Sequence, residues 1–280
     1  EIAEAIRDYA PKAWVINYTN PMSLCVKTLY HVFPEIKAFG CCHEVFGTQK
    51  LLAQIAEREL GLTNIAREDI VVNVLGLNHF TWFDRASYKG IDLFPVYRHF
   101  IETHFEEGFE EKDNNWMNST FACAHRVKFD LFQKYGWIAA AGDRHLAEFM
   151  PPIYLKDPQT VASWKFGLTT VTWRKEDLKK RLEKSKRLVS GEEQVELNPS
   201  GEEGILLIKA LCGLTRVISN VNIPNTAGQI PNLPKSAVVE TNAVFSRDSI
   251  APVYAGNLTE EIRQLMLPHV MNHEEYLTCQ

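Results

Sequence analysis

The chain lacks the features that point to a nucleic acid, a membrane or a disulfide framework. Its net charge is −5, from 30 Lys and Arg against 35 Asp and Glu, and no basic stripe stands out, which argues against a nucleic-acid partner. No apolar run approaches the roughly 20 residues of a membrane span. The six cysteines show no framework spacing, so we expect free thiols in a reducing, cytoplasmic compartment.

Local metal and phosphate motifs are missing as well. There is no CxxC pair, no HExxH and no Gly-rich phosphate loop. The chain starts at Glu1, inside a helical pattern and without Met, so we expect it to begin partway through a longer protein. Its 280 residues are enough for one large or two ordinary domains with a sizeable core.

Short apolar strands alternate with helical segments in the first part of the chain. Strands are expected at 13–19, 35–41 and 70–77, with helical segments at 1–13, 23–33 and 48–60. This alternation predicts a parallel α/β sheet, in which ligands bind beyond the carboxyl ends of the strands. The polar clusters NYTNP, CCHE and LNHF follow these strands and are expected to converge on one edge.

Helical patterns dominate after about residue 95. They cover 97–112, 116–135 and 173–191, and the last is charged enough to be a solvated helix. A helix leading into a strand is expected at 204–224, and a helix closes the chain. We therefore expect a second, helix-rich domain from about residue 80, whose apolar helices suggest a homo-oligomer.

The stretch FGCCHEVFG places a thiol, an imidazole and a carboxylate side by side. A thiolate and a neutral imidazole suit a divalent transition metal, which makes Cys42 and His79 a candidate pair. Taken alone, the two residues are more simply explained as buried structural groups, because their separation is not a local metal-binding spacing. His43 can donate or accept a proton near neutral pH.

Asparagines and a charged helix start provide further candidates. The amides of Asn17 and Asn20 can hydrogen-bond a sugar hydroxyl or a carboxamide, although both residues are also ordinary turn formers. The segment AAAGDRHLAEF brings Asp143, Arg144 and His145 to a helix start, where they could form an acid–base cluster. Simple capping by Asp143 is the alternative.

The segment PNTAGQIPNLP is a polar loop that contains Asn225. It is too long and too polar to be only a hairpin turn. A loop that covers a ligand and a purely structural loop are both compatible with this composition.

The motifs NYTNPM, GCCHEVFGTQ, GLNHFTWF and PNTAGQIPNLP, in this order, resemble glycoside hydrolase family 4 over nearly the whole chain. The resemblance implies an α/β fold. Residues 1–79 would be the C-terminal part of a Rossmann-like NAD-binding domain whose phosphate-loop half is absent from this chain. Residues 80–280 would be a helix-rich α+β domain for substrate binding, catalysis and oligomerisation.

The resemblance also implies the cofactors and the reaction. Members use NAD and Mn²⁺ to oxidise the sugar at C3, remove the C2 proton, eliminate the leaving group and add water. The form CHEV resembles the branch that acts on α-D-galacturonides, and a His after the metal-binding Cys argues against a 6-phosphoglycoside. The expected partner is therefore a small-molecule sugar.

The resemblance assigns roles to residues of this sequence. Cys42 and His79 would hold the metal, and His43 would assist departure of the leaving group. Many members use a Tyr as the base, and none is present in the matching region, so Asp143 is our first choice and His145 our second. The substrate-binding residues would be Asn20, Asn78, Arg144 and Asn225, with Asn17 and Asn20 at the cofactor; Arg144 would bind the carboxylate of a uronide.

Two other functions share some of these features. An NAD-dependent 2-hydroxy acid dehydrogenase has a similar sheet and an Asn-Pro strand end, but it needs no metal-binding cysteine. A catalytically inactive sugar-binding protein would keep the fold without turnover.

Overall fold

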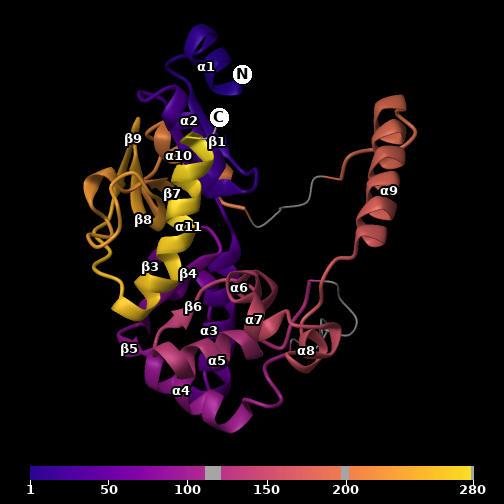
Figure 1. Ribbon diagram of the computed structural model, residues 1–280, viewed down its shortest axis with the longest axis vertical. Helices are drawn as coiled ribbons and strands as arrows, with labels where there is room; N and C mark the ends of the chain where they lie inside the picture. Colours follow the sequence, from indigo (N-terminus) through magenta and orange to yellow (C-terminus); the bar gives the residue numbers. More distant parts are fainter. Residues whose placement is uncertain (111–120, 197–201, 279–280) are drawn as a thin grey trace.

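The computed structural model describes residues 1–110, 121–196 and 202–278, and its centre is one mixed sheet (Figure 1). The strand order is β1-β2-β7-β8-β3-β4-β5, with β6 paired to β4 and β9 paired to β8. The strands are β1 Trp14–Asn17, β2 Lys37–Gly40, β3 Ile70–Leu77, β4 Phe80–Tyr88, β5 Ile91–Asp92, β6 Ile138–Ala139, β7 Val217–Pro224, β8 Val238–Ser246 and β9 Ser249–Pro252.

The described residues form helices that pack on both faces of this sheet and one, α9, that extends away from it (Figure 1). They are α1 Ile2–Tyr9, α2 Met22–Val32, α3 Glu44–Leu60, α4 Leu93–His104, α5 Arg126–Tyr135, α6 Asp143–Phe149, α7 Pro151–Tyr154, α8 Pro158–Ser163, α9 Val171–Ser190, α10 Gly204–Leu211 and α11 Glu260–Thr278. Two short 3₁₀ turns are η1 Arg67–Asp69 and η2 Asn225–Ala227. Side chains of β3 show the two layers, because Val74 packs with α3 and α4 whereas Leu75 and Leu77 pack with α11.

The expected elements are largely present, with two differences. The α/β class is confirmed, and α9 has no buried side chain and extends away from the other elements (Figure 1), as expected for a solvated helix. The helix expected over 116–135 starts only at Arg126; residues 121–125 form turns and a bridge, and 116–120 lie outside the described residues. No helix of the described segments is both long and apolar enough to cross a membrane.

The expected parallel sheet is wrong for the third strand. Strands β1 and β2 run parallel, but β3 is antiparallel to both β8 and β4. The tight turn accounts for the pairing with β4, because such a hairpin can only join antiparallel strands. The pairing with β8 is set by a strand from a distant part of the chain. The sheet is also continuous across the expected boundary at residue 79, and the division into two domains stays a prediction.

The polar clusters after β2 and β3 nevertheless come together, although these two strands are not parallel. One row of paired residues crosses the sheet from Gly40 through Asn222 and Glu240 to Gly76. Gly40 ends β2 and Gly76 lies at the end of β3, yet the two strands run in opposite directions. Their carboxyl ends therefore reach the same row of the sheet from opposite sides, with β7 and β8 between them.

Candidate active site

The turn between β3 and β4 has an unusual backbone that fixes His79. His79 has a φ of 138°, a strained value for a residue with a side chain, and its N–H donates to the carbonyl of Leu77 at 2.6 Å. Gly76 has a φ of 149°, and a Cβ there would lie 2.6 Å from the carbonyl oxygen of Phe80. Only glycine fits this position, so the tight turn that carries His79 depends on it.

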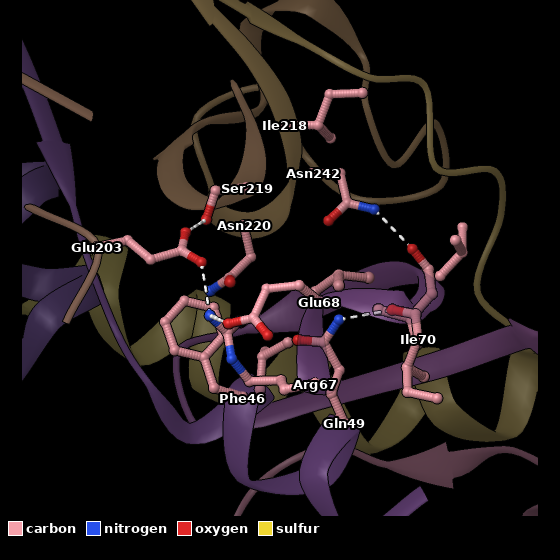
Figure 2. Close-up of a pocket in the computed structure, with 14 residues that line it drawn as sticks. Phe46, Gln49, Arg67, Glu68, Ile70, Glu203, Ile218, Ser219, Asn220 and Asn242 are labelled. Atoms are coloured by element: carbon pink, nitrogen blue, oxygen red, sulfur yellow. Dashed lines mark hydrogen bonds and ion pairs between the residues drawn. The ribbon is translucent and has the colours of Figure 1, made fainter. Parts of the chain in front are cut away.

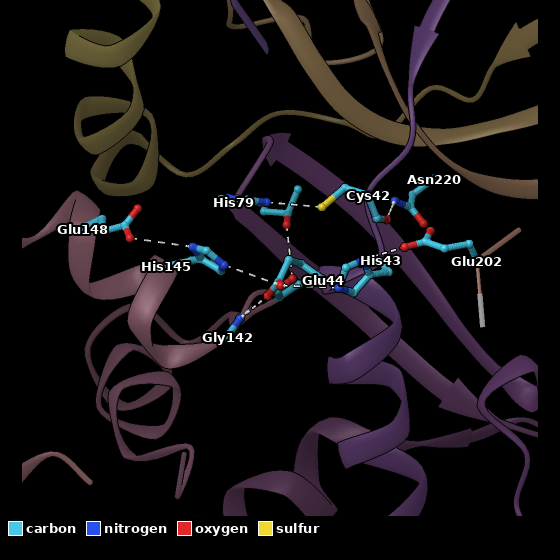
Figure 3. Close-up of polar contacts among 11 residues, drawn as sticks. Cys42, His43, Glu44, His79, Gly142, His145, Glu148, Glu202 and Asn220 are labelled. Atoms are coloured by element: carbon cyan, nitrogen blue, oxygen red, sulfur yellow. Dashed lines mark hydrogen bonds and ion pairs between the residues drawn. The ribbon is translucent and has the colours of Figure 1, made fainter. Parts of the chain in front are cut away.

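Cys42 and His79 face each other across the meeting point of the two strands (Figure 3). Cys42 Sγ lies 3.3 Å from His79 Nε2. Two ligands at about 2.3 and 2.1 Å from one metal ion would be about 3.1 Å apart at a right angle and about 3.6 Å apart at a tetrahedral angle. The observed separation falls within this range, so the pair can bind one cation without rearrangement.

Buried acids and bases around the pair set its electrostatics. Burial raises the pKa of the Cys42 thiol well above its ordinary value, and the carboxyl of Glu240 adds to this effect. Burial, and then the neighbouring His145, lower the pKa of His79 to about 4, so its ring is neutral near pH 7. A neutral imidazole is ready to bind a metal ion, and a cation at the sulfur would favour the thiolate.

His145 stacks beside His79 and lies between two carboxylates (Figure 3). The two imidazole rings have centroids 4.3 Å apart. His145 Nε2 is 3.6 Å from Glu44 Oε1, and His145 Nδ1 is 3.8 Å from Glu148 Oε1. His145 is therefore a basic group held next to the candidate metal ligand.

Glu44 connects helix α3 to the segment before α6. Its Oε2 accepts a hydrogen bond from the N–H of Gly142 at 2.7 Å. Burial opposes ionisation of Glu44, but His145 and the Gly142 N–H outweigh burial and lower the pKa of the carboxyl. Glu44 is thus an anion that links the CCHE segment to the helix carrying His145.

A cavity of about 550 Å³ opens beside these groups. It is lined by Asn20, Pro21, Met22, Ser23, Leu77, Asn78, His79, His145, Glu148, Phe149, Arg174, His269 and His273. The walls come from the end of β1, the β3–β4 turn, α6, α9 and α11. Four residues expected at the site, Asn20, Asn78, His79 and His145, therefore share one cavity.

The asparagines of the NYTNP segment differ in their positions. Asn20 lines the cavity, and its Oδ1 accepts a hydrogen bond from the N–H of Met22 at 3.2 Å, which caps α2. Asn17 donates to the carbonyl of Thr19 at 2.9 Å and is not among the residues lining the described cavities. The turn chemistry expected for both asparagines is present, and Asn20 also lines the ligand space.

His43 lies on the far side of Glu44, in a neighbouring pocket of about 300 Å³. Its side chain is 64% exposed, and Nδ1 is 2.8 Å from Glu202 Oε1. The distance from His43 Nε2 to Glu44 Oε1 is 4.0 Å. The structure therefore separates His43 from the larger cavity by the Glu44 carboxylate.

Two guanidinium groups share one hydroxyl near the larger cavity. Arg144 Nη2 donates to Thr169 Oγ1 at 3.4 Å, and Arg174 Nε donates to the same oxygen at 3.0 Å. Arg174 lines the cavity and Arg144 lies over the ring of Phe121. Neither guanidinium forms an ion pair with a carboxylate among the residues described. The nearest compensation for Arg144 is Glu148, whose pKa is lowered chiefly by His145 and in part by Arg144.

Asp143 does not join the cluster, which corrects its expected role as the base. Its side chain is fully buried, and its two oxygens accept the N–H groups of Val127 and Lys128 at 3.1 and 3.2 Å. Burial raises the pKa of Asp143 to about 6, although Lys128 opposes this effect. A carboxylate that caps α5 from inside the protein cannot reach a sugar carbon.

The position of Asn225 also does not support its expected role in binding the substrate. It is fully buried, and its Nδ2 donates to the carbonyls of Ile230, Leu233 and Pro234 while its Oδ1 accepts the N–H of Ile230. Its amide donors and its Oδ1 are thus all engaged in holding the loop PNTAGQIPNLP in shape. Of the two interpretations of this loop, a cover over a ligand or a purely structural loop, the contacts of Asn225 fit the second.

Several residues at the site were not identified from the sequence. Glu240 is buried in β8, where Asn220 bridges its Oε1 at 2.7 Å and the Cys42 carbonyl at 3.1 Å. Glutamate inside a strand gives no hint of this position. His269 and His273 are four residues apart on α11, a helical spacing that could have identified them as neighbours on one face.

A further cavity of about 270 Å³ is less suited to catalysis (Figure 2). Arg67 stacks on Phe46 and is paired with Glu203 and Glu68, at 2.9 and 2.7 Å. The amides of Gln49 and Asn242 donate to backbone carbonyls of β3. The polar groups labelled in this cavity are thus engaged with one another and with the sheet.

The chain matches known proteins over nearly its whole length. Residues 1–58 match the sequence profile of the family 4 glycosyl hydrolases, and residues 74–278 match that of the family 4 glycosyl hydrolase C-terminal domain. The alpha-galacturonidase of Lachnoclostridium phytofermentans is 73% identical over 274 residues, which is 98% of this chain and 59% of that protein. The chain spans about three fifths of the length of the curated relatives it matches.

Solved structures show the same fold. The crystal structure of lplD from Bacillus subtilis has a TM-score of 0.92 at 53% identity, covering 98% of this chain and 62% of that one. A 6-phospho-alpha-glucosidase from gut microorganisms, solved in complex with NAD and Mn²⁺, has a TM-score of 0.70 at 19% identity, covering 98% of this chain and 60% of that one. At this identity the second structure supports the fold alone.

Proposed function

Because the chain belongs to family 4 of the glycosyl hydrolases, we propose that the complete protein hydrolyses α-D-galacturonides with NAD and a divalent metal. The observation that carries the proposal is the pairing of Cys42 with His79 at the wall of a sugar-sized cavity, with His145 stacked against His79. Relatives at 53% to 73% identity that bear the name alpha-galacturonidase support the uronide as substrate.

The residues present fit both expected groups. Cys42 and His79 would hold Mn²⁺, since their donor atoms have the separation of two adjacent ligands on one ion. Asn17 and Asn20, at the end of β1, would contact the nicotinamide end of NAD. When bound, the two groups supply hydride transfer at C3 of the sugar and polarisation of the C3 oxygen.

His145 is the base in this proposal, in place of Asp143. It lines the cavity, lies against the metal-binding pair and has Glu44 and Glu148 near its two ring nitrogens. These carboxylates would stabilise the imidazolium formed when His145 takes the C2 proton. The base is therefore on the same side of the cavity as Cys42 and His79, which would hold the metal.

His43 would donate the proton to the leaving group. It follows Cys42 directly and faces the pocket beyond Glu44, where its exposed side chain can exchange protons with water. The leaving group would extend toward this neighbouring pocket while the sugar occupies the larger cavity. Asn20 and Asn78, which line that cavity, would bind sugar hydroxyls.

The carboxylate of a uronide would be held by Arg144 and Arg174. Two guanidinium groups that share Thr169 Oγ1 create a positive region, and one of them lines the cavity. A carboxylate there would neutralise the repulsion between them and accept hydrogen bonds in the bidentate geometry that Arg favours.

The same proposal includes the cellular context. Residues 1–79 and 80–280 would act as cofactor-binding and substrate domains of a homo-oligomeric enzyme. The five described cysteines are all free thiols, which suits the cytoplasm. The comparisons give no support to a 2-hydroxy acid dehydrogenase or to an inactive sugar-binding protein.

The decisive experiment uses the full-length protein and an aryl α-D-galacturonide, with NAD⁺ and Mn²⁺ omitted in turn. We expect turnover of the uronide only when both are present, and little turnover of the matching aryl α-D-galactoside. Turnover of the neutral galactoside alone would support the proposed reaction but exclude a galacturonide as its substrate. Sugar binding without any turnover would favour the inactive binding protein, and turnover of a 2-hydroxy acid without metal would favour the dehydrogenase.

A further inference from the structure

A second cluster of metal-ligand side chains lies outside the proposed active site. The ligand atoms of Cys123, His125 and Asp143 all lie within 4.8 Å of one another. Within residues 1–110, 121–196 and 202–278, no other group of three His, Cys, Asp or Glu side chains converges in this way. The three residues come from two segments, since Cys123 and His125 precede α5 and Asp143 begins α6.

We propose that Cys123, His125 and Asp143 form a second metal site, separate from Cys42 and His79, which binds a zinc-type divalent cation. Three protein ligands leave a fourth, tetrahedral position for water. Cys123 and His125 line the pocket of about 300 Å³, which gives an ion and its water a way in. On binding, the Cys123 thiol releases its proton to solvent and becomes a thiolate ligand.

The distances agree with tetrahedral coordination. A sulfur at about 2.3 Å and a nitrogen at about 2.1 Å from zinc are separated by about 3.6 Å at the tetrahedral angle. Cys123 Sγ and His125 Nδ1 are 3.7 Å apart. The cluster as a whole needs to close by only about 1 Å, because ligand atoms on zinc lie roughly 3.4 to 3.6 Å apart.

Backbone geometry and charge also support the site. His125 has a φ of 59°, a left-handed value that is costly for a residue with a side chain and is common at functional sites. Asp143 uses one lone pair of each oxygen for the N–H groups of α5, which leaves others free for a metal. Two cations lie near Asp143: Arg126, which is paired with Glu106, and Lys128, which donates to Thr48 Oγ1 at 2.9 Å. With Arg126 balanced by Glu106, Lys128 is the cation left for the cluster. A thiolate and a carboxylate exceed its single charge.

The site would have a structural consequence for α6. Asp143 lies two residues before His145, and Gly142 donates to Glu44. An ion on Asp143 would tie the first turn of α6 to the segment before α5. The metal would thereby hold in place the helix that carries His145.

The test uses full-length protein and Co²⁺, whose bond to a thiolate gives a near-ultraviolet charge-transfer band. Cys42→Ser removes the thiolate of the proposed active site, so any remaining band reports another cysteine. We expect Cys42→Ser to bind Co²⁺ with one such band, displaced by Zn²⁺. Adding Cys123→Ser should abolish the band, whereas adding Cys25→Ser, at another partly buried thiol, should preserve it.

His125→Gln in the Cys42→Ser background provides an independent variant. It should weaken Co²⁺ binding more than tenfold while the circular dichroism spectrum stays unchanged, even if the double Cys variant does not fold. A folded Cys42→Ser protein without a band at saturating Co²⁺ would overturn the site. A band that survives Cys123→Ser, or unchanged affinity in His125→Gln, would do the same.

Discussion

Cys42 Sγ and His79 Nε2 lie 3.3 Å apart although 37 positions separate them in the sequence. Their approach results from two strands, β2 and β3, that run in opposite directions and end at the same row of the sheet. Strand β2 ends at Gly40 and β3 nears its end at Gly76, in one row of the sheet. Each cluster then follows its strand by two or three residues, which brings a thiol and an imidazole to one point.

Replacing either member of this pair should abolish metal-dependent turnover. We expect Cys42→Ser and His79→Gln to lower kcat by more than about 100-fold, because even partners of metal ligands contribute 10- to 100-fold. Initial rates are measured against Mn²⁺ concentration in the full-length protein. Cys212→Ser, at an exposed thiol, is the matched control and should leave the rate unchanged. Wild-type rates in Cys42→Ser at saturating Mn²⁺ would remove this residue from the metal site.

Removing the imidazole of His145 should affect proton transfer at C2. We expect His145→Gln to lower kcat by about 100- to 10,000-fold, the usual contribution of a general base. Deuterium uptake at C2 of the sugar from D₂O, followed by NMR, should slow by a similar factor. His99→Gln is the matched control, since its side chain is 66% exposed on α4, away from the cavity, and it should cost less than about threefold. Unchanged deuterium uptake in His145→Gln would assign the base elsewhere.

Loss of either guanidinium should act on the uronide alone. Arg144→Ala and Arg174→Ala should each raise KM for an aryl α-D-galacturonide by about 10- to 100-fold, the value of hydrogen bonds to a charged group. KM for the neutral galactoside should stay within about threefold, because it has no carboxylate for these groups to bind. Lys175→Ala is the charge-matched control on α9. Equal effects on both sugars would reject carboxylate binding by these arginines.

Much of the fold could be predicted because its signals are local. The apolar periodicity of α3 and the short runs of β1 and β2 depend on neighbouring residues, and each was expected near its observed place. The direction of β3 could not be read in the same way. A buried strand has the same apolar composition whether its partners run parallel or antiparallel. The turn at Asn78 and His79 fixes only the pairing of β3 with β4, whereas its other partner, β8, comes from a distant part of the chain.

The candidate site could likewise be predicted only where local signals were enough. Cys42, His79 and Asn78 could be placed because their motifs are contiguous and follow strands. Asp143 and His145 stand two residues apart in one motif, yet α6 turns the first into the protein and the second into the cavity. Sequence spacing on a helix gives the angle between them but not which side faces the ligand.

The loop PNTAGQIPNLP should depend on Asn225 for stability and not for catalysis. Asn225→Ala removes the hydrogen bonds to Ile230, Leu233 and Pro234, and it leaves the Leu233 carbonyl and the Ile230 N–H without these partners. We expect the free energy of unfolding to fall by roughly 2 to 4 kcal/mol, measured by urea denaturation. KM should change little in the protein that remains folded. Asn257→Ala, at an exposed position, should be nearly neutral, and a large rise in KM without loss of stability would restore a substrate role to Asn225.

Glu240 should make the stability of the protein depend on pH. Burial raises the pKa of this carboxyl from its ordinary 4.5 to about 7, even though Asn220 and other amides favour its ionised form. A group whose pKa is higher in the folded state stabilises the fold below its ordinary pKa, and this contribution is lost as pH rises through the folded value. The loss between pH 4.5 and pH 7 is about 3 kcal/mol for this group.

Glu240→Gln keeps the shape and the hydrogen bond from Asn220 but removes the titration. The difference in unfolding free energy between variant and wild type should therefore shift in favour of the variant by up to about 3 kcal/mol from pH 4.5 to pH 8. Urea denaturation with EDTA present keeps the metal state constant across the series. Glu275→Gln, at an exposed carboxyl, should show no such shift. A difference that stays constant with pH would mean that Glu240 ionises at its ordinary pKa, and the negative charge near Cys42 would then be present at all neutral pH values.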